Sequence, residues 1–497
     1  MLYSIETKLI NKKKFRDVNS EDYSMRKLLL INPPQTFERK RTSEGLAPPL
    51  GLLYLKAMIQ DCNVKILDLS VSDNPKQTFI QTFQSEDWDA VGITILTYCL
   101  DSVRQLVKLI KKNSDTYLIG GGAHATLAPN DCLTIGFDAV VVGEGELVIS
   151  DLIHSKTRGI IQGKAVTNLD AIPFPDRSTL DNTKYGVFGF LQLQQPSTSI
   201  MISRGCPYRC RFCGRITKGF VRRRSAASVI KELKELQRQG FENIFIADDT
   251  FITNRKWVAA FCHALERKKL RFNFFYQTRI DNFDKESAKA LRKAGTQYIS
   301  FGIESIHPNV LRFYNKTSKL SMWRDLTKTV LGYCNETGIY SQASLIIGAP
   351  METEEMFWES YDFVSEQGAD TINVNPLVYM VGSDIWREAV ERGIIKSNEY
   401  LISVSDRALC PIPPERIVEI CDEAFQRVIR NQRRVLFKTL RHIDRFRAGL
   451  LSMAVRKFIS WNLLGGNWQR HYDILKEFGY GKRNPEQLAS TQLNNDS

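Results

Sequence analysis

Three of the ten cysteines in this chain lie close together, in the segment SRGCPYRCRFCGR at 203–215. Cys206, Cys210 and Cys213 have the spacing C-x3-C-x2-C. A structural zinc site needs four protein ligands, and no further Cys or His stands at the usual short spacing. A cubane iron–sulfur cluster has four iron corners, so three thiolates would leave one iron open to a substrate or cofactor. Chance clustering of inert thiols is the simpler alternative.

The cysteines follow an apolar run that begins a series of alternating strand and helix patterns. The six strand patterns lie at 198–205, 243–251, 271–279, 298–305, 340–350 and 371–379. Six strand–helix units are fewer than the eight of a complete barrel. We therefore expect a partial (β/α)6 barrel over 198–395, with the cysteine loop directly after its first strand.

The amino-terminal part of the chain has the same alternation on a smaller scale. Strand patterns lie at 27–32, 64–70, 90–96, 116–123 and 139–146, and amphipathic helix patterns stand between most of them. Such alternation predicts a parallel doubly wound sheet. We expect an α/β, Rossmann-like (flavodoxin-like) domain over 26–155, followed by a linker rich in Pro, Asp and Asn over 156–197.

The chain is basic, with a formal net charge of +13 and a pI of about 9.2. Its first 25 residues form a charged extension without the apolar core of a secretory signal, which favours a cytoplasmic protein. Residues 396–497 have helical patterns, with many Lys and Arg residues between 427 and 457. We expect helices docked on the barrel with a solvated basic side. A helix on a membrane surface that delivers a lipid is the alternative. Nucleic acid is disfavoured, because aromatic residues do not alternate with the basic ones.

The motif C-x3-C-x-aromatic-C, with Phe212 before the last cysteine, resembles the signature of the radical S-adenosylmethionine (SAM) enzymes. The resemblance implies that Cys206, Cys210 and Cys213 hold a 4Fe–4S cluster, with Phe212 beside the cofactors. The open iron would chelate the amino and carboxylate groups of SAM. One electron, from a low-potential donor such as flavodoxin or ferredoxin, would then yield a 5′-deoxyadenosyl radical.

More motifs of this family lie at the ends of the expected barrel strands. In IADDTF, Asp248 and Asp249 would face the SAM ammonium, although capping of the next helix is an equally simple role. Arg279 in QTR would meet the ribose or carboxylate, and Glu304 in GIES would bind the amino acid or ribose hydroxyls. Gly348 belongs to the family's glycine-rich turn after the fifth strand. All lie at the functional rim of a barrel.

The amino-terminal motifs APPLGLLYL, GG-x-HAT and VVGEGE resemble the subgroup of radical SAM enzymes that has a cobalamin-binding domain. The resemblance implies cofactor contacts from loops at the carboxyl edge of the sheet, through Thr94, Gly120, Gly121, Gly122, His124, Gly143 and Glu144. The motif Asp-x-His-x-x-Gly, whose His ligates cobalt, is absent. We therefore expect His124 to be a satisfied His beside the cofactor tail, and the lower cobalt ligand stays unassigned.

Enzymes of this subgroup mostly methylate carbon. The resemblance therefore implies a cobalamin-dependent radical SAM methyltransferase that acts on an unactivated carbon of a lipid or natural product. A cyclase or rearrangement enzyme with the same cofactors is one alternative. An iron–sulfur electron carrier or redox sensor is the alternative that is not an enzyme. Peripheral contact with a membrane through the basic helices remains a second possibility for localisation.

Overall fold

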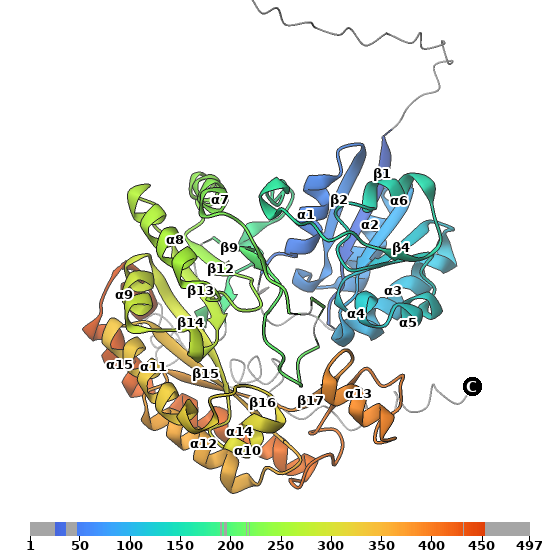
Figure 1. Cartoon of the computed structure of the whole chain (residues 1–497). Coiled ribbons are helices and arrows are strands. Elements are labelled where there is room, and N and C mark those ends of the chain that lie inside the picture. Colours follow the sequence, from blue (N-terminus) through green and yellow to red (C-terminus); the bar gives the residue numbers. More distant parts are fainter. Residues whose placement is uncertain are drawn as a thin grey trace, which may run out of the picture.

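The computed structural model describes residues 25–35, 47–188, 191–192, 196–214, 216–217, 219–430 and 432–452. It contains two α/β domains that lie side by side, the amino-terminal one in blue to teal and the second in green to orange (Figure 1). The predicted extension, apart from Met25, and the last 45 residues of the predicted helical region fall outside the described residues.

The first domain is built on a six-stranded parallel sheet. Its strands are β1 (Arg26–Asn32), β2 (Cys62–Asp68), β3 (Ala90–Thr94), β4 (Tyr117–Gly121), β5 (Ala139–Val142) and β6 (Gly159–Gln162). They are ordered β2-β1-β3-β4-β5-β6, which is the flavodoxin-like order with one added strand. The predicted doubly wound domain is confirmed. The sheet continues to Gln162, inside the range predicted as linker. The sequence did not predict β6 because it is a half-exposed edge strand with a weak apolar pattern.

Helices cover both faces of this sheet. They are α1 (Leu50–Met58), α2 (Pro75–Gln84), α3 (Leu100–Asn113), α4 (Ala123–Leu127), α5 (Pro129–Ile135) and α6 (Ile149–Ser155). Apolar residues of α2, α3 and α5 form the core on one face, and those of α1 and α6 form the core on the other. Loops at the carboxyl ends of the strands are thereby left free to meet a ligand.

The second domain contains a curved, parallel, six-stranded sheet, as the sequence predicted. Its strands, in the order β16-β15-β14-β13-β12-β9, are β9 (Ser197–Ile200), β12 (Asn243–Ile246), β13 (Asn273–Thr278), β14 (Thr296–Glu304), β15 (Tyr340–Ile347) and β16 (Thr371–Pro376). The helices are α7 (Ala226–Arg238), α8 (Arg255–Arg267), α9 (Lys285–Lys293), α10 (Pro308–Phe313), α11 (Trp323–Thr337), α12 (Glu354–Glu366) and α13 (Asp384–Glu391). Helices α7 to α12 pack on the convex face, α13 packs on the strand β17 (Val378–Met380), and together they contribute to the largest core of the described residues.

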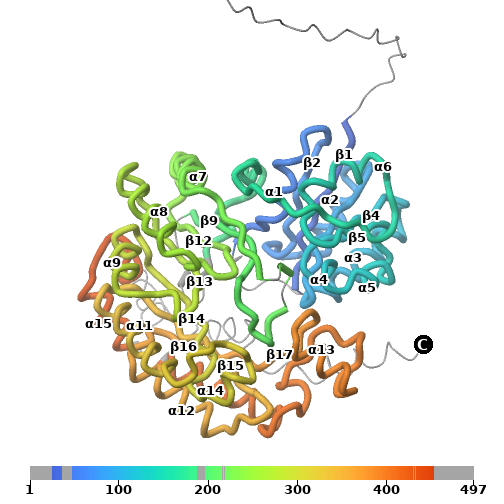
Figure 2. Tube along the Cα trace, in the orientation of Figure 1, coloured from blue at the N-terminus to red at the C-terminus, as the bar shows by residue number. Residues whose placement is uncertain are grey.

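Short two-stranded pairs join these elements. The antiparallel pairs are β7 (Val187–Phe188) with β8 (Leu191–Gln192), β10 (Ser203–Arg204) with β11 (Arg222–Arg223), and β17 (Val378–Met380) with β18 (Leu401–Ser403). The region after residue 396 is therefore not helical throughout, because β18 lies in it. Segment 381–400, which contains α13, lies beside α4 of the first domain (Figure 2).

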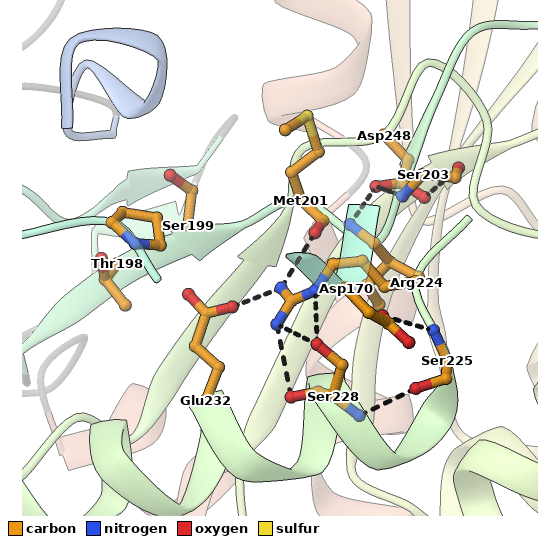
Figure 3. Close-up of polar contacts among 12 residues, drawn as sticks. Asp170, Thr198, Ser199, Met201, Ser203, Arg224, Ser225, Ser228, Glu232 and Asp248 are labelled. Atoms are coloured by element: carbon orange, nitrogen blue, oxygen red, sulfur yellow. Dashed lines mark hydrogen bonds and ion pairs between the residues drawn. The ribbon is translucent and has the colours of Figure 1, made fainter. Parts of the chain in front are cut away.

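A buried ionic network beside β9 binds the linker to the barrel. Glu232 of α7 accepts hydrogen bonds from Arg177 of the linker, at 2.9 Å, and from Arg224. All three side chains are buried. Arg224 also donates hydrogen bonds to the hydroxyl and to the backbone carbonyl oxygen of Ser228 (Figure 3). The network thereby binds the linker to the first strand and the first helix of the barrel.

Helices α14 (Pro414–Arg430) and α15 (Gln432–Arg441) follow the barrel. Phe446 packs against Phe275 and with Tyr298 and Tyr340, so the segment after α15 closes the amino-terminal end of the barrel. Arg447 is fully buried there. Docking of the basic helices is thus confirmed, but part of their basic side is buried rather than solvated. Among the described residues, no helix is long and apolar enough to cross a membrane.

Candidate active site

The cysteine loop begins with a turn that only glycine can make. Gly205 has a φ of +96°, and a Cβ there would lie 2.1 Å from the carbonyl oxygen of Phe220. Beyond it Cys206 is half-buried, Cys210 is buried and Cys213 is exposed. The middle thiol is therefore the most buried of the three, and the last lies at the surface.

The three thiols of the loop are too far apart to bind one metal ion together. Among the described residues, they do not form a group whose donor atoms all lie within 4.8 Å of one another. A single zinc ion would need such a group. The backbone N–H of Cys213 donates to the carbonyl oxygen of Cys210 at 3.2 Å, which fixes the end of the loop. The residues present fit a 4Fe–4S cluster with three protein ligands.

Arg279 lies against the cysteine loop. Its Nη1 is 3.5 Å from Sγ of Cys210, and its guanidinium stacks on the ring of Tyr208 with 3.9 Å to the centroid. Asp281 holds it through bonds of 2.9 and 2.7 Å. Burial raises the pKa of the Cys206 thiol, and the nearby Arg279 acts in the opposite direction. The residue predicted to meet SAM ribose or carboxylate thus contacts a cysteine of the loop.

Phe212 rests on the barrel rather than in solvent. Its ring meets the ring of Tyr314 edge-on, with centroids 5.3 Å apart. The N–H of Arg211 donates to the carbonyl oxygen of Tyr314 at 2.9 Å. The back of the cysteine loop therefore packs on Tyr314, the residue that follows α10. The contact of Phe212 with the cofactors stays a prediction.

Glu304 ends β14 in a strained backbone conformation, with a φ of +67°. Nζ of Lys316 lies 2.8 Å from its Oε1, and both side chains are buried. A Cβ on Gly302 would lie 2.6 Å from Oε1 of Glu304, so the pair needs glycine beside it. Strain of this kind gathers at functional sites. The ion pair with Lys316 therefore holds the predicted SAM-binding carboxylate at the rim of the barrel. The backbone carbonyl oxygen of Lys316 in turn accepts a hydrogen bond from Arg279.

The side chain of Asp248 is buried, and both of its carboxylate oxygens accept hydrogen bonds from the protein itself. Its Oδ1 accepts from the N–H groups of Ile202 and Ser203, at 2.8 and 3.0 Å, and its Oδ2 from the Ser203 hydroxyl (Figure 3). Burial raises its pKa to about 6. The alternative role as a helix cap is wrong, since Asn254 caps α8. The neighbouring Asp249 is exposed, and its contact with SAM, like that of Asp248, stays a prediction.

Gly348 forms the turn after β15, with a φ of +111° and Val404 too close for any Cβ. Glu352 is buried beneath it and accepts from the N–H groups of Gly348 and Ala349, at 2.7 and 3.2 Å. Burial raises the pKa of Glu352 to about 7. The glycine-rich turn is therefore shaped by a carboxyl group that the motif did not reveal.

The concave face of the barrel, which no helix of the described residues covers, is polar near the carboxyl ends of its strands. Its half-buried or exposed side chains there are Gln277, Ser300, Gln342, Ser344, Asn373 and Asn375. Gln342 donates to Ser300 at 3.0 Å. Below this layer lies the aromatic floor around Phe275 and Phe446. These strand positions thus offer amide and hydroxyl groups but no charged side chain.

The carboxyl edge of the first sheet has room for a ligand. A Cβ added to Gly121 or Gly143 would meet nothing within 4 Å. Gly120 is packed closely by Ile95 and Phe137, and Gly122 needs its φ of +103°. Thr94 pairs with Gly121 at the end of β3. The glycines therefore leave an open cradle that fits the tail of a large cofactor.

His124 lies below this edge and is fully buried. Its Nδ1 is 3.1 Å from the hydroxyl of Thr97, and its Nε2 is 3.1 Å from Oδ2 of Asp131. The ring of Tyr400 stands edge-on at 4.9 Å. Both ring nitrogens have partners, as expected for a satisfied His, so neither is free to ligate cobalt.

Glu144 joins the two domains. It pairs with Arg204, at 3.1 Å, and with Arg222, and it accepts from the N–H of Val166 at 2.7 Å. Burial works to raise the pKa of Glu144, but these three donors hold it below its ordinary value. Arg204 also pairs with Glu146 at 2.6 Å. Glu144, the carboxylate predicted to contact the cofactor, thus forms ion pairs with two arginines of the barrel domain.

Sequence reasoning missed the residues that hold the site from behind. Lys316 has the pattern of a surface lysine after a helix, and nothing in its neighbourhood predicts an ion pair with Glu304. Arg204 is one of several arginines beside the cysteines in the sequence, and nothing there predicts its ion pair with Glu144. Glu352 lies in a polar turn, where carboxylates are usually exposed.

Two family models match the chain, one described as Radical SAM superfamily over residues 200–364 and one as B12 binding domain over 40–153. An uncharacterized methyltransferase of Pyrococcus horikoshii is 30% identical over 416 residues, which cover 78% of this chain and 87% of that protein. An anaerobic magnesium-protoporphyrin IX monomethyl ester cyclase of Rubrivivax gelatinosus is 25% identical over 378 residues, covering 69% and 66%. Among solved structures, the radical S-adenosylmethionine methyltransferase TsrM of Kitasatospora setae, with cobalamin and a 4Fe–4S cluster bound, has a TM-score of 0.59 at 20% identity over 74% of this chain and 75% of that one. This likeness shows the same fold.

Proposed function

Because this chain belongs to the cobalamin-dependent radical SAM methyltransferases, we propose that it transfers a methyl group to an unactivated carbon of a small polar molecule. Its cofactors are a 4Fe–4S cluster, SAM and cobalamin. When bound, they supply a transferable methyl group and a radical that removes hydrogen from the substrate carbon. The protein has to hold these groups in line and exclude other hydrogen donors.

The chain's own residues divide this work. The three loop cysteines would ligate the cluster, and Arg279 would place a positive charge beside one of its thiolates. Glu304, fixed by Lys316, would orient SAM at the rim of the barrel. The open glycine edge of the first sheet would receive the cobalamin tail. Arg204 and Glu144 would keep that edge in register with the cysteine loop.

The polar concave face is the observation that carries the substrate class. Neutral amides and hydroxyls, such as Gln277, Ser344 and Asn375, recognise hydroxyl, amide and carbonyl groups of a substrate. An aliphatic chain would leave these groups without partners, at a cost in binding energy. Phe446 and the segment after α15 close the opposite end of the barrel. These features favour a polar natural product over a lipid that the basic helices would deliver.

An electron donor is needed for SAM cleavage. Cys213 and Arg209 are both exposed on the cysteine loop, so a donor can approach the cluster closely there. A positive loop suits an acidic protein such as flavodoxin or ferredoxin. We therefore extend the proposal to an acidic, low-potential donor that docks on this loop.

A cyclase with the same cofactors is the second candidate, favoured by the similarity to the Rubrivivax gelatinosus cyclase. The test uses reconstituted holoenzyme with reductant and SAM that carries a deuterated methyl group. Cell extract is first separated into an aqueous and a lipid fraction, and each is incubated with the enzyme.

Methyl transfer predicts a product that retains deuterium from the methyl group, together with equal amounts of 5′-deoxyadenosine and S-adenosylhomocysteine. Label in the aqueous fraction supports a polar substrate, and label in the lipid fraction contradicts it. Release of 5′-deoxyadenosine without S-adenosylhomocysteine would favour the cyclase. Absence of both compounds would contradict both candidates.

A further inference from the structure

Three side chains with metal-binding chemistry meet at the amino-terminal edge of the first sheet, opposite the cofactor edge. Asp61 and Cys62 stand at the start of β2, and His154 is near the end of α6. Their donor atoms all lie within 4.8 Å of one another, and no other such group exists among the described residues. Cys62 is buried, whereas Asp61 and His154 are exposed, so the group opens to solvent on one side.

The separations between these atoms suit ligands of one ion better than direct contacts. Nε2 of His154 is 3.5 Å from Oδ2 of Asp61, which is long for a hydrogen bond. Sγ of Cys62 is 3.8 Å from Oδ1 of Asp61. Around tetrahedral zinc, nitrogen and oxygen ligands stand roughly 3.4 Å apart, and sulfur and oxygen ligands roughly 3.6 Å apart. Small side-chain adjustments would therefore complete the coordination.

The surrounding hydrogen bonds orient the donor atoms toward a common point. Nδ1 of His154 lies 2.9 Å from the carbonyl oxygen of Ser150, to which it must donate. In the neutral ring, Nε2 then carries a lone pair that faces the Asp61 carboxylate, so either a proton on Nε2 or a metal cation has to lie between them. The Ser150 hydroxyl lies 3.0 and 2.9 Å from the two carboxylate oxygens of Asp61. Support of this kind is typical around metal-ligating His and carboxylate groups.

We propose that Asp61, Cys62 and His154 bind one divalent cation of the zinc type, with water in the fourth position. This site is independent of the proposed reaction, because it lies at the opposite edge of the sheet from the glycine cradle. Its ligands come from the edge strand β2 and from α6, so the ion would fasten a helix to the edge of the domain. Its role is therefore structural or regulatory for the cobalamin-binding domain.

The test uses the full chain with its 4Fe–4S cluster in place, so that the three loop cysteines are already occupied. Zinc is added and the excess is removed with a mild chelator. Zinc-edge X-ray absorption, which does not detect iron, is expected to show one zinc per chain with one sulfur and otherwise nitrogen or oxygen ligands. Absence of retained zinc, or zinc with several sulfur ligands, would overturn the proposal and leave an Asp61–His154 ion pair.

Substitutions separate this site from other cysteines and histidines. Cys62→Ala and His154→Gln are each expected to weaken zinc binding more than about 100-fold, since even supporting residues matter 10- to 100-fold. Cys132→Ala, a buried cysteine of the same domain, and His263→Gln, an exposed His of α8, should leave it unchanged. His154 is exposed, so its variant should fold, with unchanged iron content. Full zinc affinity in His154→Gln would refute the proposed site.

Discussion

Nη1 of Arg279 lies 3.5 Å from Sγ of Cys210, and Asp281 and the ring of Tyr208 fix the buried guanidinium. A positive charge at this distance stabilises the more negative, reduced form of a cluster. We predict that Arg279→Gln lowers the midpoint potential of the cluster and slows SAM cleavage about 10- to 100-fold. A redox titration followed by electron paramagnetic resonance, with 5′-deoxyadenosine quantified in parallel, measures both effects.

The conservative variant Arg279→Lys tests whether the effect is electrostatic. It keeps the charge and loses the stacking on Tyr208, so its potential should remain closer to that of the wild type than the potential of Arg279→Gln. An unchanged potential in Arg279→Gln, with a full complement of iron, would show that the guanidinium does not act on the cluster.

Arg204 links the cysteine loop to the first domain through Glu144 and Glu146. Replacement by methionine keeps much of the side-chain volume but removes both ion pairs. SAM cleavage needs only the barrel, whereas methyl transfer needs the two domains in register. We predict that Arg204→Met preserves formation of 5′-deoxyadenosine and reduces methylated product up to about 100-fold, since a misplacement of about 1 Å can cost that much. The ratio of the two products measures the uncoupling.

The matched control breaks an ion pair that joins nothing across the domains. Lys293→Met removes the exposed pair with Glu266, 2.6 Å apart, and should change neither product. A proportional loss of both products in Arg204→Met would point instead to damage of the cysteine loop.

Glu352 makes stability depend on pH. Burial raises its pKa from an ordinary 4.5 to about 7, so the folded protein holds a proton that the unfolded chain releases. The stabilisation is complete below pH 4.5 and is lost as the pH rises through 7. Glu352→Gln keeps an oxygen for the N–H groups of Gly348 and Ala349 and cannot titrate. Between pH 4.5 and 7, the wild type should lose up to about 1.4 kcal/mol of stability per pH unit through Glu352. We predict that Glu352→Gln does not show this loss.

Thermal unfolding of the apo protein at several pH values checks this prediction. The difference between the wild type and Glu352→Gln should grow in favour of the variant from about pH 5 to pH 8. Glu355→Gln, an exposed neighbour on α12, should follow the wild type. A constant difference across this range would mean that Glu352 stays ionised in the folded state.

The regular elements were predictable because each is a local pattern. The apolar run at 27–32 became β1, since a strand buried on both faces must be apolar along its length. Strand β6 was missed because its residues are alternately half-buried and exposed, a pattern shared with many loops.

The site was predictable where the chain itself carries the motif and not where folding brings distant residues together. The spacing of the three cysteines indicated a cluster without any structure. The pairs Glu304–Lys316 and Glu144–Arg222 join residues whose partners have no sequence signature. Such contacts depend on the register of strands and on domain placement, which local patterns do not contain.

Glu232 holds two buried guanidinium groups, from Arg177 and Arg224. Removing one member of such a group leaves uncompensated buried charge, which costs about 3–5 kcal/mol. We predict that Glu232→Gln lowers the free energy of unfolding by about this amount, measured by chemical denaturation of the apo protein. Glu235→Gln, an exposed residue on the same helix, should have an effect below about 0.5 kcal/mol. Equal effects of the two variants would contradict the role of the network.

Gly121 tests the cobalamin cradle without disturbing the chain. A Cβ at this position meets nothing within 4 Å, and the residue ends a strand, where β-branched residues are favoured. Gly121→Val should therefore keep the unfolding temperature of the apo protein. It would place two methyl groups where the cofactor tail is expected, so cobalamin affinity should fall by at least about tenfold, or roughly 1.4 kcal/mol. Titration with hydroxocobalamin followed by absorbance measures the affinity. Gly51→Ala, in α1 with equal free space, serves as the control, and unchanged affinity in Gly121→Val would exclude this edge as the binding site.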